Sequence, residues 1–190
     1  MEVEVSAEAK DKKLNQMVAI TVVVLSVFTG VCNIKDGNLV QAMQQAKADS
    51  VDTWNEYQAT RTKLHVAEAE RDEIAIIAAN ANEAGKAQGA ERLKALSAAI
   101  AKYKAESPTL AAEAKAQSDQ YDALNVHDDQ FDASEALIST AISMAAVAAL
   151  SESFFLLAGG WAFGAFGMFM GIAGFARLAF HPDILSNFLG

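Results

Sequence analysis

The residues best suited to chemistry stand together at His127, Asp128 and Asp129. An imidazole and two carboxylates are common ligands of divalent metals and common groups for proton transfer. The other two histidines, His65 and His181, are far from this triplet in the chain, so no second imidazole stands at metal-ligand spacing. We therefore predict no metal site and no cofactor, and interpret the triplet as a solvated linker; a weak metal or proton site is the alternative.

The motifs of nucleophilic and phosphate chemistry are missing from the sequence. There is no Gly-x-Ser-x-Gly pattern, the single cysteine, Cys32, has no nearby histidine, and Gly164 and Gly167 lie within an apolar run that cannot cradle a phosphate. The 24 acidic residues outnumber the 15 basic ones and give a net charge of -9, which excludes a basic nucleic-acid binder. The sequence therefore predicts a protein that is not an enzyme and binds no nucleic acid.

A first apolar stretch lies near the amino terminus. Between Lys13 and Lys35 there are 21 uncharged residues, and a helix of that length spans about 30 Å, the thickness of a bilayer core. Lysines before the stretch would also suit a secretory signal peptide, but the end of the stretch lacks a small-x-small cleavage site. We predict a polar segment over residues 1–13 and an uncleaved transmembrane helix over 14–34.

A second apolar stretch lies near the carboxyl terminus and is twice as long. Residues 136–176 contain one charge, Glu152, so the chain must cross a membrane, turn and cross back. The turn falls either at residues 151–153 or at Gly159 and Gly160. The first placement keeps Glu152 in water, and a carboxylate in hydrocarbon costs about 2.5 kcal/mol or more. We predict transmembrane helices over 134–151 and 154–180 and a tail over 181–190.

Residues 35–133 are charged and rich in alanine, glutamine, glutamate and lysine, which is typical of exposed helix. Gly85 and Gly89 are the glycines that interrupt its middle, so we predict a helical hairpin with a turn near 80–90. The return arm carries a coiled-coil seam with alternating spacings of three and four residues. Its apolar members are Leu93, Leu96, Ile100, Tyr103, Leu110, Tyr121 and Leu124.

Three further features of the hairpin lead to predictions. Pro108 predicts a kink or a helix restart with Ser107 as the N-cap. Trp54 and Tyr57 share a helical face, where they either form hairpin core or anchor a partner. The outgoing arm carries a patchier predicted seam through Val40, Met43, Lys47, Ser50, Trp54, Tyr57, Arg61 and Leu64.

The last predicted span carries glycines at spacings of four, three, four and three, which places them on one helical face. Such a face allows another helix to approach closely within a membrane. Its partner is either the alanine- and serine-rich span before it or the same span of a neighbouring copy. The predicted helix-packing face consists of Gly160, Gly164, Gly167, Gly171 and Gly174.

A family of uncharacterised bacterial membrane proteins has a signature that resembles one stretch of this chain, from Asn33 to Ala59 (NIKDGNLVQAMQQAKADSVDTWNEYQA). The resemblance implies an amino-terminal span, a charged helical region and two closing spans, and it carries no activity because the family is a domain of unknown function. One departure is the turn between the last two spans, where similar proteins place basic residues and this chain has Ser151, Glu152 and Ser153.

These features predict an all-α integral membrane protein with three transmembrane helices and a long extramembrane helical hairpin. We expect the protein to lie in the bacterial inner membrane. Because Lys10, Lys12 and Lys13 precede the first span, we expect its amino terminus in the cytoplasm and its hairpin in the periplasm. We expect the protein to act as a scaffold or accessory subunit in the lipid bilayer, bound to itself as a homo-oligomer or to a larger membrane complex. The alternative is a small channel or transport subunit with Glu152 and Arg177 along a path.

Overall fold

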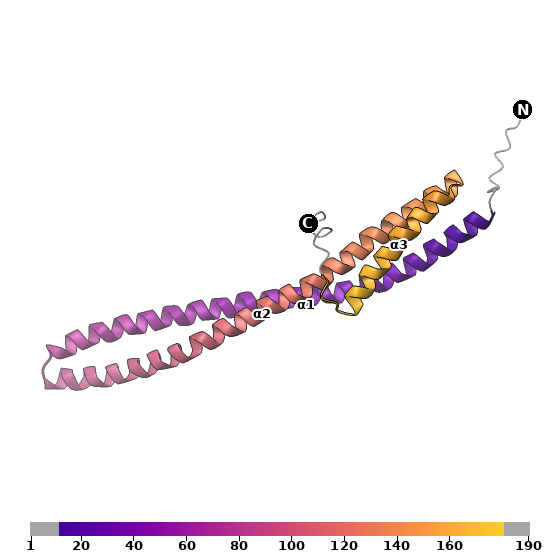
Figure 1. Ribbon diagram of the computed structural model, residues 1–190. Helices are drawn as coiled ribbons and strands as arrows, with labels where there is room; N and C mark the ends of the chain where they lie inside the picture. Colours follow the sequence, from indigo (N-terminus) through magenta and orange to yellow (C-terminus); the bar gives the residue numbers. More distant parts are fainter. Residues whose placement is uncertain (1–11, 181–190) are drawn as a thin grey trace, which may run out of the picture. The chain divides into compact units, whose positions relative to one another are not determined.

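The computed structural model describes residues 12–180, whose regular elements are three α-helices (Figure 1). They are α1 (Lys12–Ala79), α2 (Glu83–Ser151) and α3 (Phe154–Phe175). No strand occurs in the described range, so the all-α fold class is confirmed. Of the predicted segment 1–13 only Lys12 and Lys13 are described, and the predicted tail 181–190, with His181, lies outside the described residues.

The described chain divides into two compact units. The three-helix unit contains residues 12–43 and 122–180, and the hairpin unit contains residues 44–121. Each of the three helices includes a stretch that is long and apolar enough to cross a membrane, by length and composition. These apolar stretches belong to the three-helix unit, and the charged arms of α1 and α2 form the hairpin unit.

The hairpin reverses at Asn80, Ala81 and Asn82, before the two glycines rather than at them. The Asn82 side chain caps α2 by accepting a hydrogen bond from the Gly85 N–H at 2.9 Å. Gly89 lies within α2, where an added Cβ would stand 2.6 Å from the Ala78 Cβ. Gly89 therefore allows the close approach of the two arms beside the turn, whereas an added Cβ at Gly85 would meet the turn residue Ala81 at 2.7 Å.

The hairpin arms meet along small and apolar side chains. A cluster of buried residues, Leu64 and Ala67 of α1 with Leu96 and Ile100 of α2, forms the core of this unit. Farther from the turn, the Ser50 hydroxyl donates a hydrogen bond to the Ala114 carbonyl oxygen at 3.2 Å, so the helices are close there as well. The members of the predicted α2 seam within the hairpin unit are all buried or half-buried: Leu93, Leu96, Ile100, Tyr103, Leu110 and Tyr121. The last predicted member, Leu124, is half-buried and belongs to the three-helix unit.

The prediction for the outgoing arm was wrong at alternate positions. Lys47, Trp54 and Arg61 are exposed. Neighbouring small residues occupy the inner face of α1 instead, and these do not stand out as apolar in the sequence. Ala46 and Thr60 are buried between the predicted positions, and Ala67 is buried one turn after the last of them.

The predicted restart at Pro108 was also wrong. Helix α2 continues through Pro108 without a break, and the Ser107 hydroxyl donates to the Tyr103 carbonyl oxygen at 2.8 Å instead of capping a new helix. Inside helices, serine and threonine hydroxyls commonly donate in this way to the carbonyl oxygen one turn earlier in the same helix.

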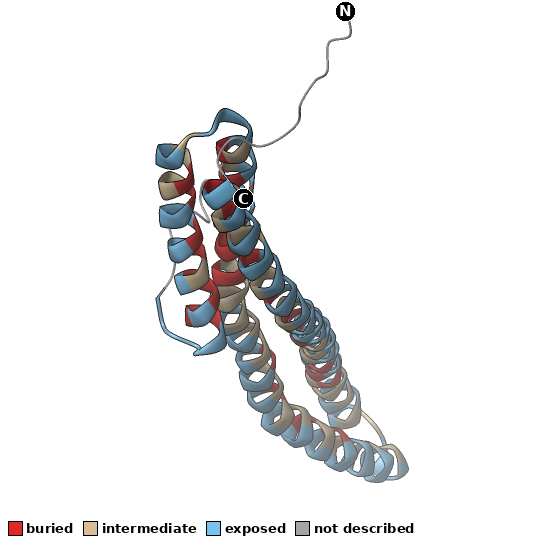
Figure 2. Ribbon diagram, turned by 90° about the vertical axis from the view of Figure 1, so that its right-hand side faces the viewer, coloured by how far each residue is buried: buried red, intermediate tan, exposed pale blue. Residues whose placement is uncertain are grey.

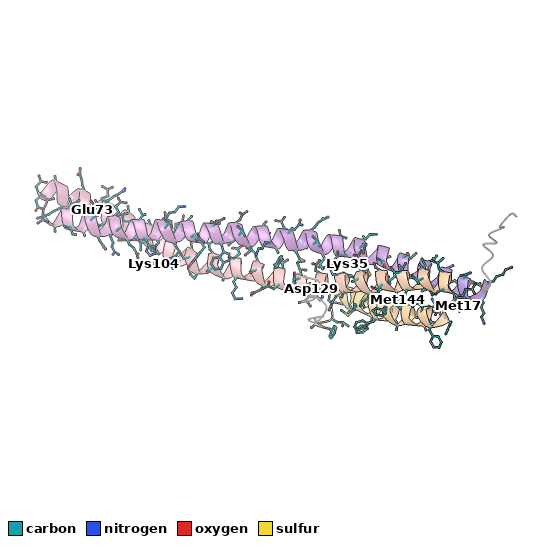
Figure 3. The ribbon with its side chains drawn as sticks, turned by 90° about the horizontal axis from the view of Figure 1, so that it is seen from above. Met17, Lys35, Glu73, Lys104, Asp129 and Met144 are labelled. Atoms are coloured by element: carbon teal, nitrogen blue, oxygen red, sulfur yellow. The ribbon has the colours of Figure 1, made fainter. Side chains whose placement is uncertain are left out.

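The three-helix unit buries its apolar residues between the helices, as the red segments of Figure 2 show. One cluster joins the start of α1 to the end of α2 and the start of α3, through Leu14, Val18, Ala148 and Leu157. Figure 3 labels Met17 and Met144 toward this end of the unit, and Lys35 and Asp129 at the opposite end.

Helices α2 and α3 both end with a charged residue in the left-handed region. Glu152 has a φ of 52° and Arg177 a φ of 50°. The Ser153 N–H donates to the Ala148 carbonyl oxygen at 3.1 Å, and the Leu178 N–H donates to the Ala173 carbonyl oxygen at 3.0 Å. These six-to-one bonds form Schellman-type caps. The α2–α3 turn is therefore at 151–153, the first of the two placements considered, and α3 ends at Phe175, five residues before the predicted boundary.

We expect Ile100→Asp to destabilise the hairpin unit by roughly 3 kcal/mol or more, because it removes a buried side chain and buries a charge. The matched control is Ala101→Asp, at the exposed neighbouring position. Urea unfolding of the hairpin unit, followed by circular dichroism, measures both variants. Equal unfolding midpoints would contradict a buried seam at Ile100.

Candidate functional site

The strongest candidate for a functional surface is the glycine face of α3, whose five residues are all buried. An added Cβ at Gly160 would stand 3.1 Å from the Ala141 carbonyl oxygen. At Gly167 it would stand 3.1 Å from the Ser134 carbonyl oxygen and 2.7 Å from the Ile138 side chain. The backbone of α3 therefore rests almost directly on α2, at a distance that a larger residue does not allow.

Helix α1 covers the same face of α3 from another side. At Gly164 an added Cβ would meet the Leu25 side chain at 3.1 Å, and at Gly171 it would meet the Phe28 ring at 2.7 Å. The Trp161 indole N–H donates a hydrogen bond to the Thr21 hydroxyl oxygen at 2.8 Å. The last predicted glycine, Gly174, lies against the Phe131 ring of α2.

Of the two partners considered for the glycine face, the structure provides the one within the same chain. It also adds α1, which the sequence interpretation did not include. Because both neighbours already touch this face, the glycines complete an intramolecular bundle, and the surface offered to other chains must be sought elsewhere.

A buried amide holds the chain after α3 against α2. Gln130 is fully buried, and its Nε2 donates to the Leu178 carbonyl oxygen at 2.9 Å and to the Phe180 carbonyl oxygen. Its Oε1 lies 3.1 Å from His127 Nδ1. His127 therefore belongs to this structural contact, and no group of three or more His, Cys, Asp or Glu within residues 12–180 is arranged to hold a metal.

Two carboxyl groups face each other at this end of the three-helix unit. Asp36 of α1 and Asp128 of α2 are both half-buried, and in each the Oδ1 atom is buried with no hydrogen-bond partner among the described residues. The charges of Asp129, Asp132 and Glu135 also act on this pair. The sequence interpretation missed the pair because Asp36 and Asp128 are 92 positions apart.

The carboxyl cluster has a strong electrostatic consequence. Burial, followed by the charges of Asp36 and Asp132, raises the pKa of Asp128 to about 7. Burial is also the largest cause that raises the pKa values of Asp36 and Asp132. Near neutral pH about half of the molecules therefore keep a proton on Asp128, which an ordinary aspartate would have lost.

Comparison with known proteins places this arrangement in a family. A family model described as a domain of unknown function (DUF4337) matches residues 14–177. The chain belongs to this family. The DUF4337 match covers all of α2 and α3 and nearly all of α1, and it agrees with the resemblance to an uncharacterised domain family.

No curated protein and no solved structure matches the chain. DUF4337 carries no described activity, so the function must be argued from the geometry of these helices.

The residues of the channel alternative lie far apart in the three-helix unit. Glu152 occupies the turn before α3, and Arg177 follows the other end of that helix. Both take the left-handed conformation of a helix cap, which accounts for their positions. The structure gives no feature that joins them along one path.

Trp54 and Tyr57, the possible partner contact, lie in the hairpin unit. Their rings form an edge-to-face pair with centroids 5.4 Å apart. Tyr57 is half-buried toward the inner face, whereas Trp54 keeps 38% of its surface exposed. A role for Trp54 in binding a partner stays a prediction.

We expect Gly167→Ile to lower the thermal stability of the three-helix unit, with a loss of about 1–3 kcal/mol, because the side chain must push α3 away from α2. The control is Ala165→Ile, at an exposed position of the same helix. Thermal unfolding in mild detergent measures both. If the Ala165 variant is the less stable one, the packing face of α3 is not the glycine face.

The carboxyl cluster predicts how stability changes with pH. The folded unit keeps a proton on Asp128 up to pH about 7, whereas the unfolded chain releases it near pH 4. The folded state thus binds more protons in this interval, so the free energy of unfolding falls as the pH rises from about 4 to about 7.

We therefore expect Asp128→Asn to raise the melting temperature at pH 8 and to reduce the difference between pH 5 and pH 8. Asp122→Asn, at an exposed position of α2, is the control. Thermal unfolding of the purified protein at both pH values gives the result. A lower melting temperature for Asp128→Asn at pH 8 would contradict the destabilising role of the carboxyl pair.

Proposed function

We propose that this protein is a non-enzymatic membrane-anchored scaffold or accessory subunit. In this proposal α1, α2 and α3 each cross the membrane once, within the three-helix unit, and the hairpin unit stands outside the membrane. Its task is to present a long helical surface at a fixed place on a bilayer.

The observation that carries the proposal is the apolar outer surface of the three-helix unit. Large hydrophobic side chains are exposed on α1 and on α3, with exposed fractions of 57% for Ile20 and 91% for Phe155. Soluble proteins rarely show apolar surface that is so continuous. Contact of this surface with lipid tails would cost no free energy, whereas its exposure to water would. The exposed large hydrophobic residues of α3 are Phe154, Phe155, Trp161, Phe163, Phe166, Phe169, Ile172 and Phe175.

The ends of the unit support one membrane orientation. Leu14 and Val18 pack near the end of α2, so Lys12 and Lys13 lie at the same end of the unit as Glu152. Lysines beside a first span favour the cytoplasmic side. We therefore propose a cytoplasmic amino terminus and a hairpin in the periplasm, with the protein in a bacterial inner membrane.

The hairpin unit suits a role in binding other proteins rather than catalysis. Its arms are held by a narrow inner seam and by ion pairs between arms, such as Lys104 with Glu68 at 2.8 Å. Its outer faces carry charges of both signs on long helices. Such a surface offers many polar contacts to a larger membrane complex, which is the accessory role that we propose.

Cysteine labelling in intact spheroplasts tests the membrane proposal. In a Cys32→Ala background, a thiol reagent that cannot cross the membrane should label Gln88→Cys, near the hairpin turn, and should leave Glu152→Cys unlabelled. Both positions are exposed, so both should react after the membrane is permeabilised. Labelling of Glu152→Cys alone would invert the orientation, and labelling of both in intact spheroplasts would rule out the three spans.

A further inference from the structure

Helix α1 carries a second regular face, which lies on the side opposite its buried residues. The buried side within the three-helix unit contains Val18, Leu25, Cys32 and Leu39. The opposite side is exposed and repeats with spacings of four and three residues, as the contact face of a coiled coil does. We name it the outer α1 stripe, and its members are Val23, Val27, Gly30, Ile34, Gly37 and Gln41.

The two glycines of the outer α1 stripe have no packing role within the chain. A Cβ added at Gly30 or Gly37 would meet no heavy atom within 4 Å outside the local helix. In contrast, each of the buried α3 glycines has a neighbour closer than that. Glycine weakens a helix interior, so two glycines at open positions indicate a contact that the isolated chain does not make.

The outer α1 stripe also lacks charge. The charged residues in this part of α1, Lys35 and Asp36, are both half-buried and lie off the stripe. The stripe ends in Gln41, whose amide both donates and accepts hydrogen bonds and so can pair with a copy of itself. Two identical helices can therefore meet along this stripe without placing like charges opposite each other.

Helix α1 is the least covered of the three apolar helices. Only 17% of its most apolar window is buried, against 39% for α2 and 33% for α3. Apart from Gln41, the outer α1 stripe consists of glycine and β-branched residues, whereas the outer face of α3 consists mainly of phenylalanine. β-branched side chains have few rotamers to lose, so their burial against another helix requires little ordering.

We infer that the outer α1 stripe is the contact surface between two copies of this chain, which pack α1 against α1 in parallel. This inference rests on the proposed function, because two copies in one membrane share one orientation and a two-fold axis then runs along the membrane normal. Each residue of the stripe meets its own copy across that axis. Gly30 and Gly37 allow the closest approach, and Ile34 lies between them.

Disulfide crosslinking of the full chain in native membranes tests this contact. In a Cys32→Ala background, copper phenanthroline should link Ile34→Cys and Gln41→Cys into covalent dimers. The matched controls are Val31→Cys and Ala42→Cys, which are exposed on α1 but lie off the stripe, and they should stay monomeric. Adding Gly30→Ile to the Ile34→Cys variant should reduce the dimer fraction roughly tenfold, whereas adding Ala42→Ile should not.

The outcomes separate this inference from the proposed function. Equal crosslinking at all four positions, or none at Ile34→Cys and Gln41→Cys, would overturn the α1 contact and leave the membrane scaffold in place if the labelling pattern of Gln88→Cys and Glu152→Cys holds. Preferred crosslinking at Val31→Cys and Ala42→Cys would move the interface to another face of α1 and would also overturn the inference. Recovery of the chain in the soluble fraction would overturn the proposed function itself.

Discussion

The close approach of α3 to α2 is the constraint on which the three-helix unit depends. A Cβ added at two glycines of α3 would stand only 3.1 Å from the carbonyl oxygens of Ser134 and Ala141. The close contact therefore exists because α3 has glycine at these two positions. This contact sets how far α3 lies from α2, and α1 then packs into the angle between them through Leu25 and Phe28. In a bilayer the hydrophobic effect between helices is absent, so such contacts would hold the unit through dispersion and a few hydrogen bonds.

The same unit contains an opposing interaction at one end. Asp36 and Asp128 each keep a buried oxygen without a hydrogen-bond partner, and a proton on Asp128 relieves the repulsion between the two carboxylates. Gln130 lies in this region and binds two carbonyl oxygens after α3. Apolar packing thus dominates along the helices, and polar groups decide the stability at the end where α1 and α2 leave the unit.

Much of the helical arrangement could be predicted from sequence because large apolar residues mark it. Leu96 and Ile100 predicted the α2 seam, and the lone charge of Glu152 predicted the turn before α3. The inner face of α1 was predicted only at alternate positions, because Ala46 and Thr60 resemble exposed helix and Trp54 resembles core. Asp36 and Asp128 could not be paired, since no local pattern relates residues on two helices joined by a distant turn.

The sequence distances between contacting residues imply an order of assembly during synthesis. In the hairpin, Arg92 and Glu70 are only 22 positions apart and Ser50 and Ala114 are 64 apart, so pairing of the arms can spread from the turn outward. The bond between Trp161 and Thr21 joins residues 140 positions apart. Helix α1 must therefore wait for almost the whole chain before its neighbours exist. Its outer stripe, in contrast, is complete as soon as α1 is made and needs no later part of the chain to contact another newly made copy. Chains that emerge from one messenger side by side would then meet before either bundle is complete, so pairing of α1 would come before packing of α3.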